Sequence, residues 1–261
     1  MSTESRWRLD GSRAVVTGGT RGIGLAVVLE LLDLGASVVT AGRELDDLDP
    51  RLIAARDAER LTIVACDLAT ADGRDALLGA IPDGWDAIDV LVNNVGTNVR
   101  QPSLAVTEAD YHRILATNVT CAWDLARALH PRLTASGRGA IVNVGSVAGQ
   151  VSVGTGAVYA MSKAAIEHLT RYLAVEWARD GIRVNAVAPW YIRTPLVEPI
   201  LGDAVTLDRV LSRTPMGRIG EPHEAAAAIV FLCLPAASFV TGQTLAADGG
   251  FLAYGFSPRP L

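Results

Sequence analysis

The chain of 261 residues is half hydrophobic and 20% charged, with a formal net charge of −5. A chain of this size can bury a large core in one domain. Its acidic balance, without a basic stripe or a polybasic run, argues against partners such as nucleic acid or a membrane surface. Three widely spaced cysteines, Cys66, Cys121 and Cys233, fit buried thiols in a reducing compartment. The four histidines show no ligand-like spacing, so we expect no metal site.

Two further features bear on location. The first ten residues are polar and lack the apolar stretch of a signal peptide. The longest apolar run, residues 225–237, is too short to cross a bilayer and contains Pro235. We therefore expect a cytoplasmic protein.

Short β-rich runs alternate with helical patterns along the whole chain. The predicted strands are 14–17, 37–40, 61–65, 89–93, 140–144, 183–188 and 245–247. The predicted helices include 21–34, 107–129, 159–178 and 221–232. This alternation of helices with continuously apolar strands predicts an α/β doubly wound Rossmann-type fold, with a central, mostly parallel seven-stranded sheet flanked by helices. Because no linker or repeat interrupts it, we expect a single domain over residues 1–261.

A glycine-rich turn lies between the first predicted strand and the first helix. Its glycines allow a tight turn and close approach of the backbone to a pyrophosphate, and the helix N-terminus offers N–H groups and a positive dipole. The spacing G-x-x-x-G-x-G differs from the common G-x-G-x-x-G, but its place between strand and helix favours a dinucleotide site. The turn residues expected to bind the dinucleotide are Gly18, Thr20, Arg21, Gly22, Ile23 and Gly24.

The end of the second predicted strand carries the signal for cofactor choice. An acid about 20 residues beyond the glycines binds the ribose hydroxyls of NAD, whereas an arginine accommodates the 2′-phosphate of NADP. Here Gly42 stands at the acidic position and Arg43 follows it, and Arg21 can converge on the same phosphate. We therefore expect NADP(H) rather than NAD(H). Two solvated arginines are the plainer alternative, and Glu44 complicates the pattern.

Polar residues follow the next two predicted strands at the edge where ligands lie in such folds. Asp67 fits two roles, either accepting from an adenine amino group or capping the next helix. After the fourth strand, adjacent amides and a glycine can tie strand ends together while the backbone touches the ribose. The residues expected to contact the cofactor here are Cys66, Asp67, Leu68, Asn94, Val95 and Gly96.

Tyr159 and Lys163 lie four residues apart, on one face of a predicted helix. An ammonium beside a phenol favours the phenolate and lowers the tyrosine pKa from about 10 towards working pH. Such a pair suits proton exchange with a carbonyl/alcohol couple, although the spacing alone is common on ordinary helices. Ser146 follows the fifth strand, where its hydroxyl either donates to a substrate carbonyl or caps a turn. Asn118 is a poor residue inside a helix, which indicates either bound water or a bend.

Together these motifs resemble the short-chain dehydrogenase/reductase family over nearly the whole chain. The motifs are Gly18-x3-Gly22-x-Gly24, Asn93-Asn94-x-Gly96, Asn118, Ser146, Tyr159-x3-Lys163 and Asp248-Gly249-Gly250. Three segments, 94–98, 188–195 and 231–238, are similar to the tropinone reductase-like branch. Two residues depart from the commoner family pattern: Val95 replaces Ala, and Trp190 replaces Gly and changes the pocket wall.

The resemblance implies a catalytic tetrad. Tyr159 would be the general acid in reduction, and Lys163 would lower its pKa and hold the nicotinamide ribose. Ser146 would orient the substrate carbonyl, and Asn118 would hold a water in the proton relay. Further cofactor contacts would come from Pro189, Ile192 and Thr194. The resemblance also implies a homotetramer, or a homodimer, built partly from helices 107–129 and 159–178.

The predicted substrate pocket lies above the tetrad, under a lid around residues 190–215. Its expected lining is Ser146, Ala148, Val153, Tyr159, Trp190, Tyr191, Val197 and Arg100. This wall favours a hydrophobic ketone, cyclic and neutral or weakly basic. Glu198 would suit a basic amine, whereas Arg100 would suit an acidic or carrier-linked substrate.

The leading interpretation is thus an NADPH-dependent carbonyl reductase acting on a small molecule. One alternative is a 3-oxoacyl-thioester (acyl carrier protein) reductase. The other is a non-catalytic nucleotide-sensing protein on the same fold, which predicts a broken tetrad. All four tetrad positions are filled in this chain.

Overall fold

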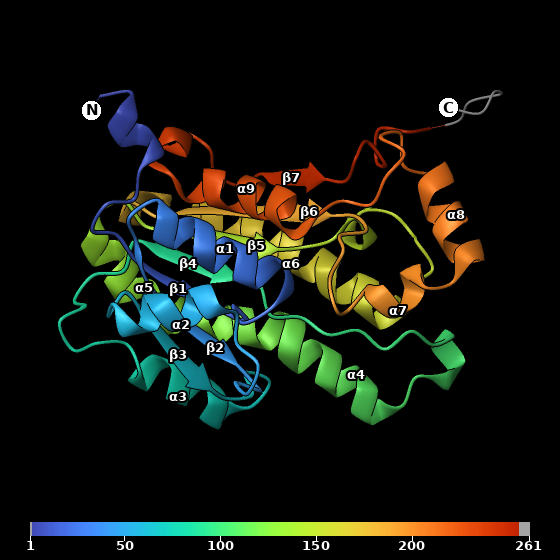
Figure 1. The fold of residues 1–261 in the computed structure, drawn as a ribbon, viewed down its shortest axis with the longest axis horizontal. Helices are drawn as coiled ribbons and strands as arrows, with labels where there is room; N and C mark the ends of the chain where they lie inside the picture. The colour runs from blue at the N-terminus through green and yellow to red at the C-terminus, as the bar shows by residue number, and fades with distance from the viewer. Residues whose placement is uncertain (1, 256–261) are drawn as a thin grey trace.

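A computed structural model describes residues 2–255 of the chain (Figure 1). Within them, seven strands form one sheet in the order β3-β2-β1-β4-β5-β6-β7, and every neighbouring pair is parallel. The strands are β1 (Arg13–Val16), β2 (Ser37–Gly42), β3 (Leu61–Ala65), β4 (Val90–Asn93), β5 (Ala140–Val144), β6 (Arg183–Pro189) and β7 (Thr244–Ala247). The predicted fold class is confirmed.

Helices cover both faces of this sheet, as Figure 1 shows. They are α1 (Gly22–Asp33), α2 (Pro50–Asp57), α3 (Ala71–Gly79), α4 (Glu108–Leu115), α5 (Cys121–Ser136), α6 (Ala157–Glu176), α7 (Glu198–Leu201), α8 (Ala204–Ser212) and α9 (Pro222–Cys233). Alternate strand residues point to opposite faces, so Ala14 and Val16 join a core with α1 and α9, while Val15 joins a core with α5 and α6. The continuously apolar strands are thereby buried on both sides.

The strand order indicates where along the sheet a ligand would bind. The chain crosses from β3 at one side to β4 on the other side of β1, so the order reverses between β1 and β4. In open parallel sheets, ligands bind at the carboxyl ends of the strands where the order reverses. The glycine turn after β1 and the segment Asn94–Gly96 after β4 therefore lie side by side.

The predicted helix 107–129 is interrupted. It consists of α4, a π-helical turn (Ala116–Thr120) and α5, which continues through Pro131 to Ser136. Asn118 lies inside the π-turn, so the poor helix residue coincides with the place where the regular α-helix is interrupted. The structure also contains four helices that the apolar pattern did not predict, namely α2, α3, α7 and α8.

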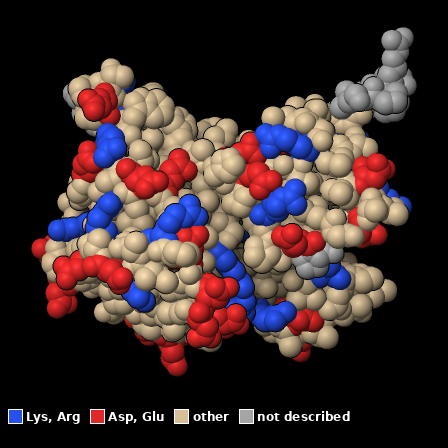
Figure 2. All heavy atoms as spheres, in the orientation of Figure 1, with Lys and Arg blue, Asp and Glu red and all other residues tan. Residues whose placement is uncertain are grey.

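Residues 190–221 leave the sheet after β6 and carry α7 and α8 before the chain returns to α9 (Figure 1). On the face drawn in Figure 2, acidic and basic side chains are interspersed, and a short run of basic atoms crosses its middle. Within residues 2–255, no helix has the length and apolarity that a membrane span requires. The same described residues contain no group of three or more side chains placed to hold a metal ion.

Candidate active site

Tyr159 and Lys163 meet at the carboxyl end of β5. Gly156, with φ of 111°, precedes the start of α6, so Tyr159 lies in its first turn. Lys163 Nζ is 5.6 Å from the centre of the Tyr159 ring and donates a 2.7 Å hydrogen bond to Val144 O. Lys163 is only 4% exposed. The helix therefore holds a buried ammonium against the strand end and beside a phenol.

Lys163 is the only lysine among the 23 basic residues of the chain. Burial withdraws its ammonium from water and lowers its pKa from 10.5 to about 8. A lone lysine at this position is conspicuous, because every other basic side chain is an arginine. Arginine stays charged when buried, whereas lysine can release its proton, so among the Lys and Arg side chains Lys163 alone can lose its charge as the pH rises past about 8.

The pKa of Tyr159 moves opposite to the sequence prediction. Burial raises it above 10, while the Ser146 hydroxyl and the positive charge of Arg100 act in the lowering direction. The predicted net lowering of the Tyr159 pKa is therefore not the direction that burial gives in the chain alone. The phenol stays protonated at neutral pH, which is the form that a proton donor needs.

Asn118 ties the loop after β4 to α6. Its Oδ1 accepts the Thr97 N–H at 2.8 Å, and its Nδ2 donates to Thr97 O at 3.0 Å and to Ser162 Oγ at 2.9 Å. Ser162 in turn donates to Tyr159 O. A Cβ on Gly96 would lie 3.4 Å from Lys163 Nζ, so glycine allows this loop to approach the lysine closely. Both amide donors of Asn118 are used structurally, and its proposed water contact stays a prediction.

Ser146 follows β5 and caps the turn that comes next. Its Oγ accepts the Ala148 N–H at 3.2 Å and so caps the short helix Val147–Gly149. A hydroxyl that accepts one hydrogen bond can still donate its own proton, so capping does not prevent it from binding a carbonyl oxygen.

The segment after β5 makes one contact that the sequence did not predict. Gln150 Nε2 donates to Glu167 Oε1 at 3.2 Å, and Glu167, one turn beyond Lys163, is 4% exposed. Burial raises the pKa of its carboxyl, with Gln150 and Arg171 acting in the other direction. Periodicity could have placed Glu167 on the inner face of α6, but not its partner.

The glycine turn forms a cradle that side chains would fill. Gly18 and Gly22 have φ of 67° and 57°, a region that favours glycine. A Cβ on Gly24 would lie 2.1 Å from Gly18 O. Asn94 Nδ2 donates to Thr17 O and Gly18 O, which fixes the turn to the end of β4. The turn thus presents bare backbone at the N-terminus of α1, as a dinucleotide phosphate requires.

The end of β2 has no room for an acidic side chain. A Cβ on Gly42 would lie 2.5 Å from Thr20 Oγ1, so Thr20 fills the space. Arg43 and Arg21 are both exposed beside this turn. The helix-capping role weighed for Asp67 is wrong, because Thr70 caps α3, while Asp67 Oδ1 accepts the Ala69 N–H at 3.0 Å. The adenine contact stays a prediction.

The segment after β6 reaches back to the glycine turn. Pro189 and Ile192 are buried, and Ile192 pairs with Gly220. A Cβ on Gly22 would lie 3.3 Å from Thr194 Cγ2, so Thr194 lies directly against the turn. Thr194, one of the residues predicted on the nicotinamide side, therefore lies at the predicted pyrophosphate site.

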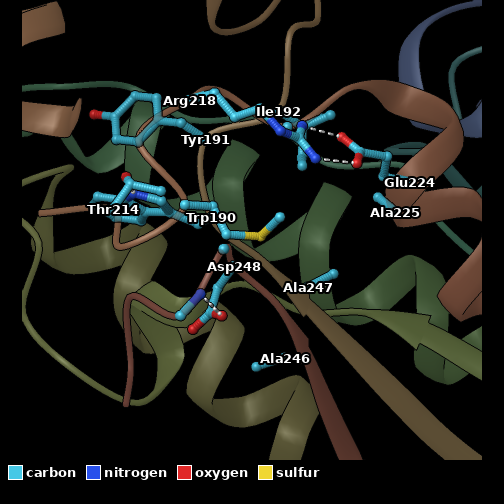
Figure 3. Close-up of a pocket in the computed structure, with 14 residues that line it drawn as sticks. Trp190, Tyr191, Ile192, Thr214, Arg218, Glu224, Ala225, Ala246, Ala247 and Asp248 are labelled. Atoms are coloured by element: carbon cyan, nitrogen blue, oxygen red, sulfur yellow. Dashed lines mark hydrogen bonds and ion pairs between the residues drawn. The ribbon is translucent and has the colours of Figure 1, made fainter. Parts of the chain in front are cut away.

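Trp190 and Tyr191 line a cavity of about 340 Å³, shown in Figure 3, together with segments 214–220 and 246–250. Among the described residues, the lining of this cavity includes neither Ser146 nor Tyr159. The other predicted substrate contacts differ in burial: Ala148 is buried, Val153 and Val197 are half-buried, and Arg100 is exposed. Arg100 does act electrostatically on Tyr159.

The buried ammonium can be measured directly. Lysine carrying an NMR-active nitrogen isotope should give one side-chain signal, because the chain has one lysine. We expect this signal to titrate with a pKa of about 8. A titration near 10.5 would contradict the burial of this group.

The same lowered pKa predicts how stability depends on pH. Between pH 8 and 10.5 the unfolded chain binds more protons at Lys163 than the folded chain, so stability rises with pH there. Relative to Lys163→Met, the wild type should gain about 3 kcal/mol of unfolding free energy across this interval. Denaturant unfolding of both proteins at several pH values measures the difference, and a constant difference would contradict the prediction.

Comparison with known proteins agrees with this geometry. The family model described as Enoyl-(Acyl carrier protein) reductase matches residues 18–252. A tropinone reductase homolog of Arabidopsis thaliana is 46% identical over 262 residues, covering 98% of each chain. One from Datura stramonium is 40% identical over 258 residues, covering 97% of this chain and 96% of that one. The structure of a gluconate 5-dehydrogenase from Burkholderia cenocepacia, in complex with NADP and tartrate, matches with a TM-score of 0.89 at 35% identity, covering 97% of this chain and all of that one.

Proposed function

The chain belongs to the short-chain dehydrogenase/reductase family of oxidoreductases, and from this premise we propose that it reduces a ketone to a secondary alcohol with NADPH. The observation that carries the proposal is the meeting of Tyr159 and Lys163 at the end of β5, beside Ser146 and next to the glycine cradle. Screening NADPH oxidation against cyclic ketones, amino ketones and acetoacetyl thioesters tests it.

The chain's own residues supply acid catalysis and orientation. When bound, the nicotinamide supplies the hydride. The O–H of Ser146 holds the carbonyl oxygen, and the protonated Tyr159 donates to that oxygen as it becomes an alkoxide. Lys163 places a positive charge beside the phenol and offsets the charge that develops on it. Asn118 fixes the loop after β4 to α6 and is proposed to hold a water of the proton relay.

NADP(H) is the proposed cofactor, for two reasons. The space where an acid would bind the ribose of NAD is closed by Thr20 against Gly42, while Arg43 and Arg21 are exposed beside it. A related gluconate 5-dehydrogenase has been solved in complex with NADP. The proposed contacts are those predicted from the sequence in the glycine turn, the ends of β2, β3 and β4, and the segment Pro189–Thr194.

A hydrophobic cyclic ketone, neutral or weakly basic, is the proposed substrate. Its pocket would be covered by the lid, residues 190–215, whose exposed and half-buried side chains include Leu196, Val197 and Leu207. Curated relatives named as tropinone reductase homologs support a cyclic ketone.

We expect a neutral cyclic ketone to give a higher kcat/KM than an acetoacetyl thioester or a keto acid. An apolar wall recognises a ring by shape and cannot repay the desolvation of a carboxylate. Initial rates with NADPH in excess, for all three compounds, measure this. Preference for the thioester or the keto acid would overturn the substrate proposal.

The second candidate is a 3-oxoacyl-thioester reductase. One observation favours it: Arg100 is exposed, and its positive charge acts to lower the pKa of Tyr159. A carrier-linked or acidic substrate would pair with such a guanidinium. In that case Arg100→Ala would lower kcat/KM for the thioester by a much larger factor than kcat/KM for the neutral ketone. The filled tetrad leaves the non-catalytic alternative without support.

We also propose a single domain over residues 1–261, location in the cytoplasm and a homotetramer. One sheet extends from Arg13 to Ala247. Exposed apolar side chains on α5 and α6, namely Trp123, Tyr172 and Val175, support assembly through these helices. Light scattering of the purified protein measures the oligomeric state.

A further inference from the structure

We propose that Trp190 is a positioning residue that holds the lid against the C-terminal turn, residues 248–254, and so over the carbonyl-binding site. The inference rests on the proposed function, because it assigns a task to the substrate lid. Trp190 is the first residue after β6, where the lid begins. Its indole makes contacts that join segments far apart in the sequence.

The start of the lid is anchored by Ile192 and Thr194, but its two helices have few contacts that hold them in place. Its helices α7 and α8 pack mainly on each other, and Val210 is the buried residue of α8. At its two ends, the Gly220 N–H donates to Tyr191 O at 3.0 Å and the Arg193 N–H donates to Gly220 O at 2.8 Å. These bonds join the two stems of the lid to each other. What fixes α8 must therefore come from contacts with the rest of the protein.

Trp190 supplies such a contact. Its ring stacks on Phe251 with centroids 3.9 Å apart and planes inclined by 10°. Its Nε1 donates to Thr214 Oγ1 at 3.1 Å, and that hydroxyl donates to Val210 O at 2.7 Å. Figure 3 shows the indole beside Thr214. One series of contacts thus runs from the C-terminal turn through the indole to the last turn of α8.

Arg213 adds a parallel contact. It follows α8 directly, and its guanidinium lies 4.8 Å from the Tyr254 ring centre and 6.0 Å from that of Phe251. Such a cation over an aromatic face is attractive. The end of α8 is therefore held to two aromatic rings of the same turn.

The C-terminal turn is a firm support for these contacts. The Asp248 carboxylate accepts the Gly250 N–H at 2.9 Å and the Leu252 N–H at 2.8 Å. The Met216 N–H donates to Gly249 O at 3.1 Å. A Cβ on Gly249 would lie 2.9 Å from Thr214 Cγ2, so the turn and the lid stem are in direct contact.

Loss of the indole should lower the population of the closed lid. The apparent affinity for substrate falls in proportion to that population, while a saturating substrate restores it. We expect Trp190→Gly to raise KM for the ketone about tenfold, since a stacked pair with a hydrogen bond is worth about that factor. The value of kcat should stay within about twofold. Phe251→Leu and Arg213→Ala should also raise KM for the ketone, each by a smaller factor than Trp190→Gly.

A second readout does not depend on activity. Leu196 in the lid is 45% exposed, and a protease that cuts after large apolar residues should cleave the lid faster in Trp190→Gly and Phe251→Leu. If the wild type reduces no ketone, the proposed function fails, but lid cleavage still tests the contact. If Trp190→Gly does not fold, the double variant Trp190→Phe with Thr214→Val takes its place in both measurements. It keeps a ring stacked on Phe251 and removes the hydrogen bond to residue 214.

Two matched controls separate this role from general stability. Trp7 is half-exposed and stacks on Phe231 at 6.0 Å, in the helix Glu4–Trp7 that precedes β1. Arg209 is exposed on α8. Trp7→Gly and Arg209→Ala should change neither KM nor lid cleavage. Unchanged KM and cleavage in both Trp190→Gly and Phe251→Leu, or equal changes in Trp7→Gly, would overturn the proposal.

Discussion

Tyr159→Phe lowers kcat for ketone reduction by ~10²–10⁴-fold and leaves NADPH affinity nearly intact, because a positioned acid–base group contributes a factor of that size. The ring stays, so its packing in the first turn of α6 is kept. Only the proton donor is lost. Burial raises the pKa of the wild-type phenol, so at neutral pH the group removed is the protonated, competent form.

The control for this substitution lies on the same helix. Tyr172 is 64% exposed on α6, and Tyr172→Phe should leave kcat unchanged. Steady-state rates and NADPH titration by fluorescence measure both quantities. A Tyr159→Phe enzyme that retains more than about a tenth of wild-type kcat would show that another group donates the proton.

Arg43→Ala removes most of the preference for NADPH over NADH. A charge-assisted hydrogen bond stabilises a complex by ~1.5–3 kcal/mol, and about 1.4 kcal/mol is a factor of ten. With Arg43 and Arg21 both proposed to contact the 2′-phosphate, we expect the wild type to prefer NADPH by about two orders of magnitude in kcat/KM. The variant should lose at least about tenfold of that ratio.

The loss should come from weaker NADPH use and not from better NADH use, because Thr20 still closes the acidic position against Gly42. Arg56 is an exposed arginine on α2 beside Asp57, and Arg56→Ala should leave the ratio unchanged. Equal kcat/KM for NADH and NADPH in the wild type would refute the cofactor assignment.

The strands were predictable because burial on both faces of the sheet leaves a continuous apolar run, as in Ala14 to Val16. The short helices α2 and α3 were missed. Their starts are set by single side chains, Asp49 and Thr70, which accept backbone N–H groups of the first turn. Such caps are polar contacts of a single residue. A search for periodic apolar residues along the sequence does not detect them.

The candidate active site, like the fold, was predictable from the sequence only in part. The positions of Tyr159 and Lys163 on one helical face follow from their spacing. The direction of the Tyr159 pKa does not, since it depends on how deeply the fold buries the phenol. The contact of Trp190 with Phe251 joins residues that are distant in sequence. No periodicity relates them, so only the three-dimensional arrangement of β6, α8 and the C-terminal turn could show it.

Transfer of a labelled hydride tests the central claim most directly. NADPH carrying deuterium at the transferable position of its nicotinamide ring is incubated with the enzyme and a cyclic ketone, and the alcohol is analysed by mass spectrometry and NMR. We expect one deuterium on the carbinol carbon for each NADPH oxidised. No NADPH oxidation with any ketone tested, or an alcohol without deuterium at that carbon, would contradict the assignment of the protein as a ketone reductase.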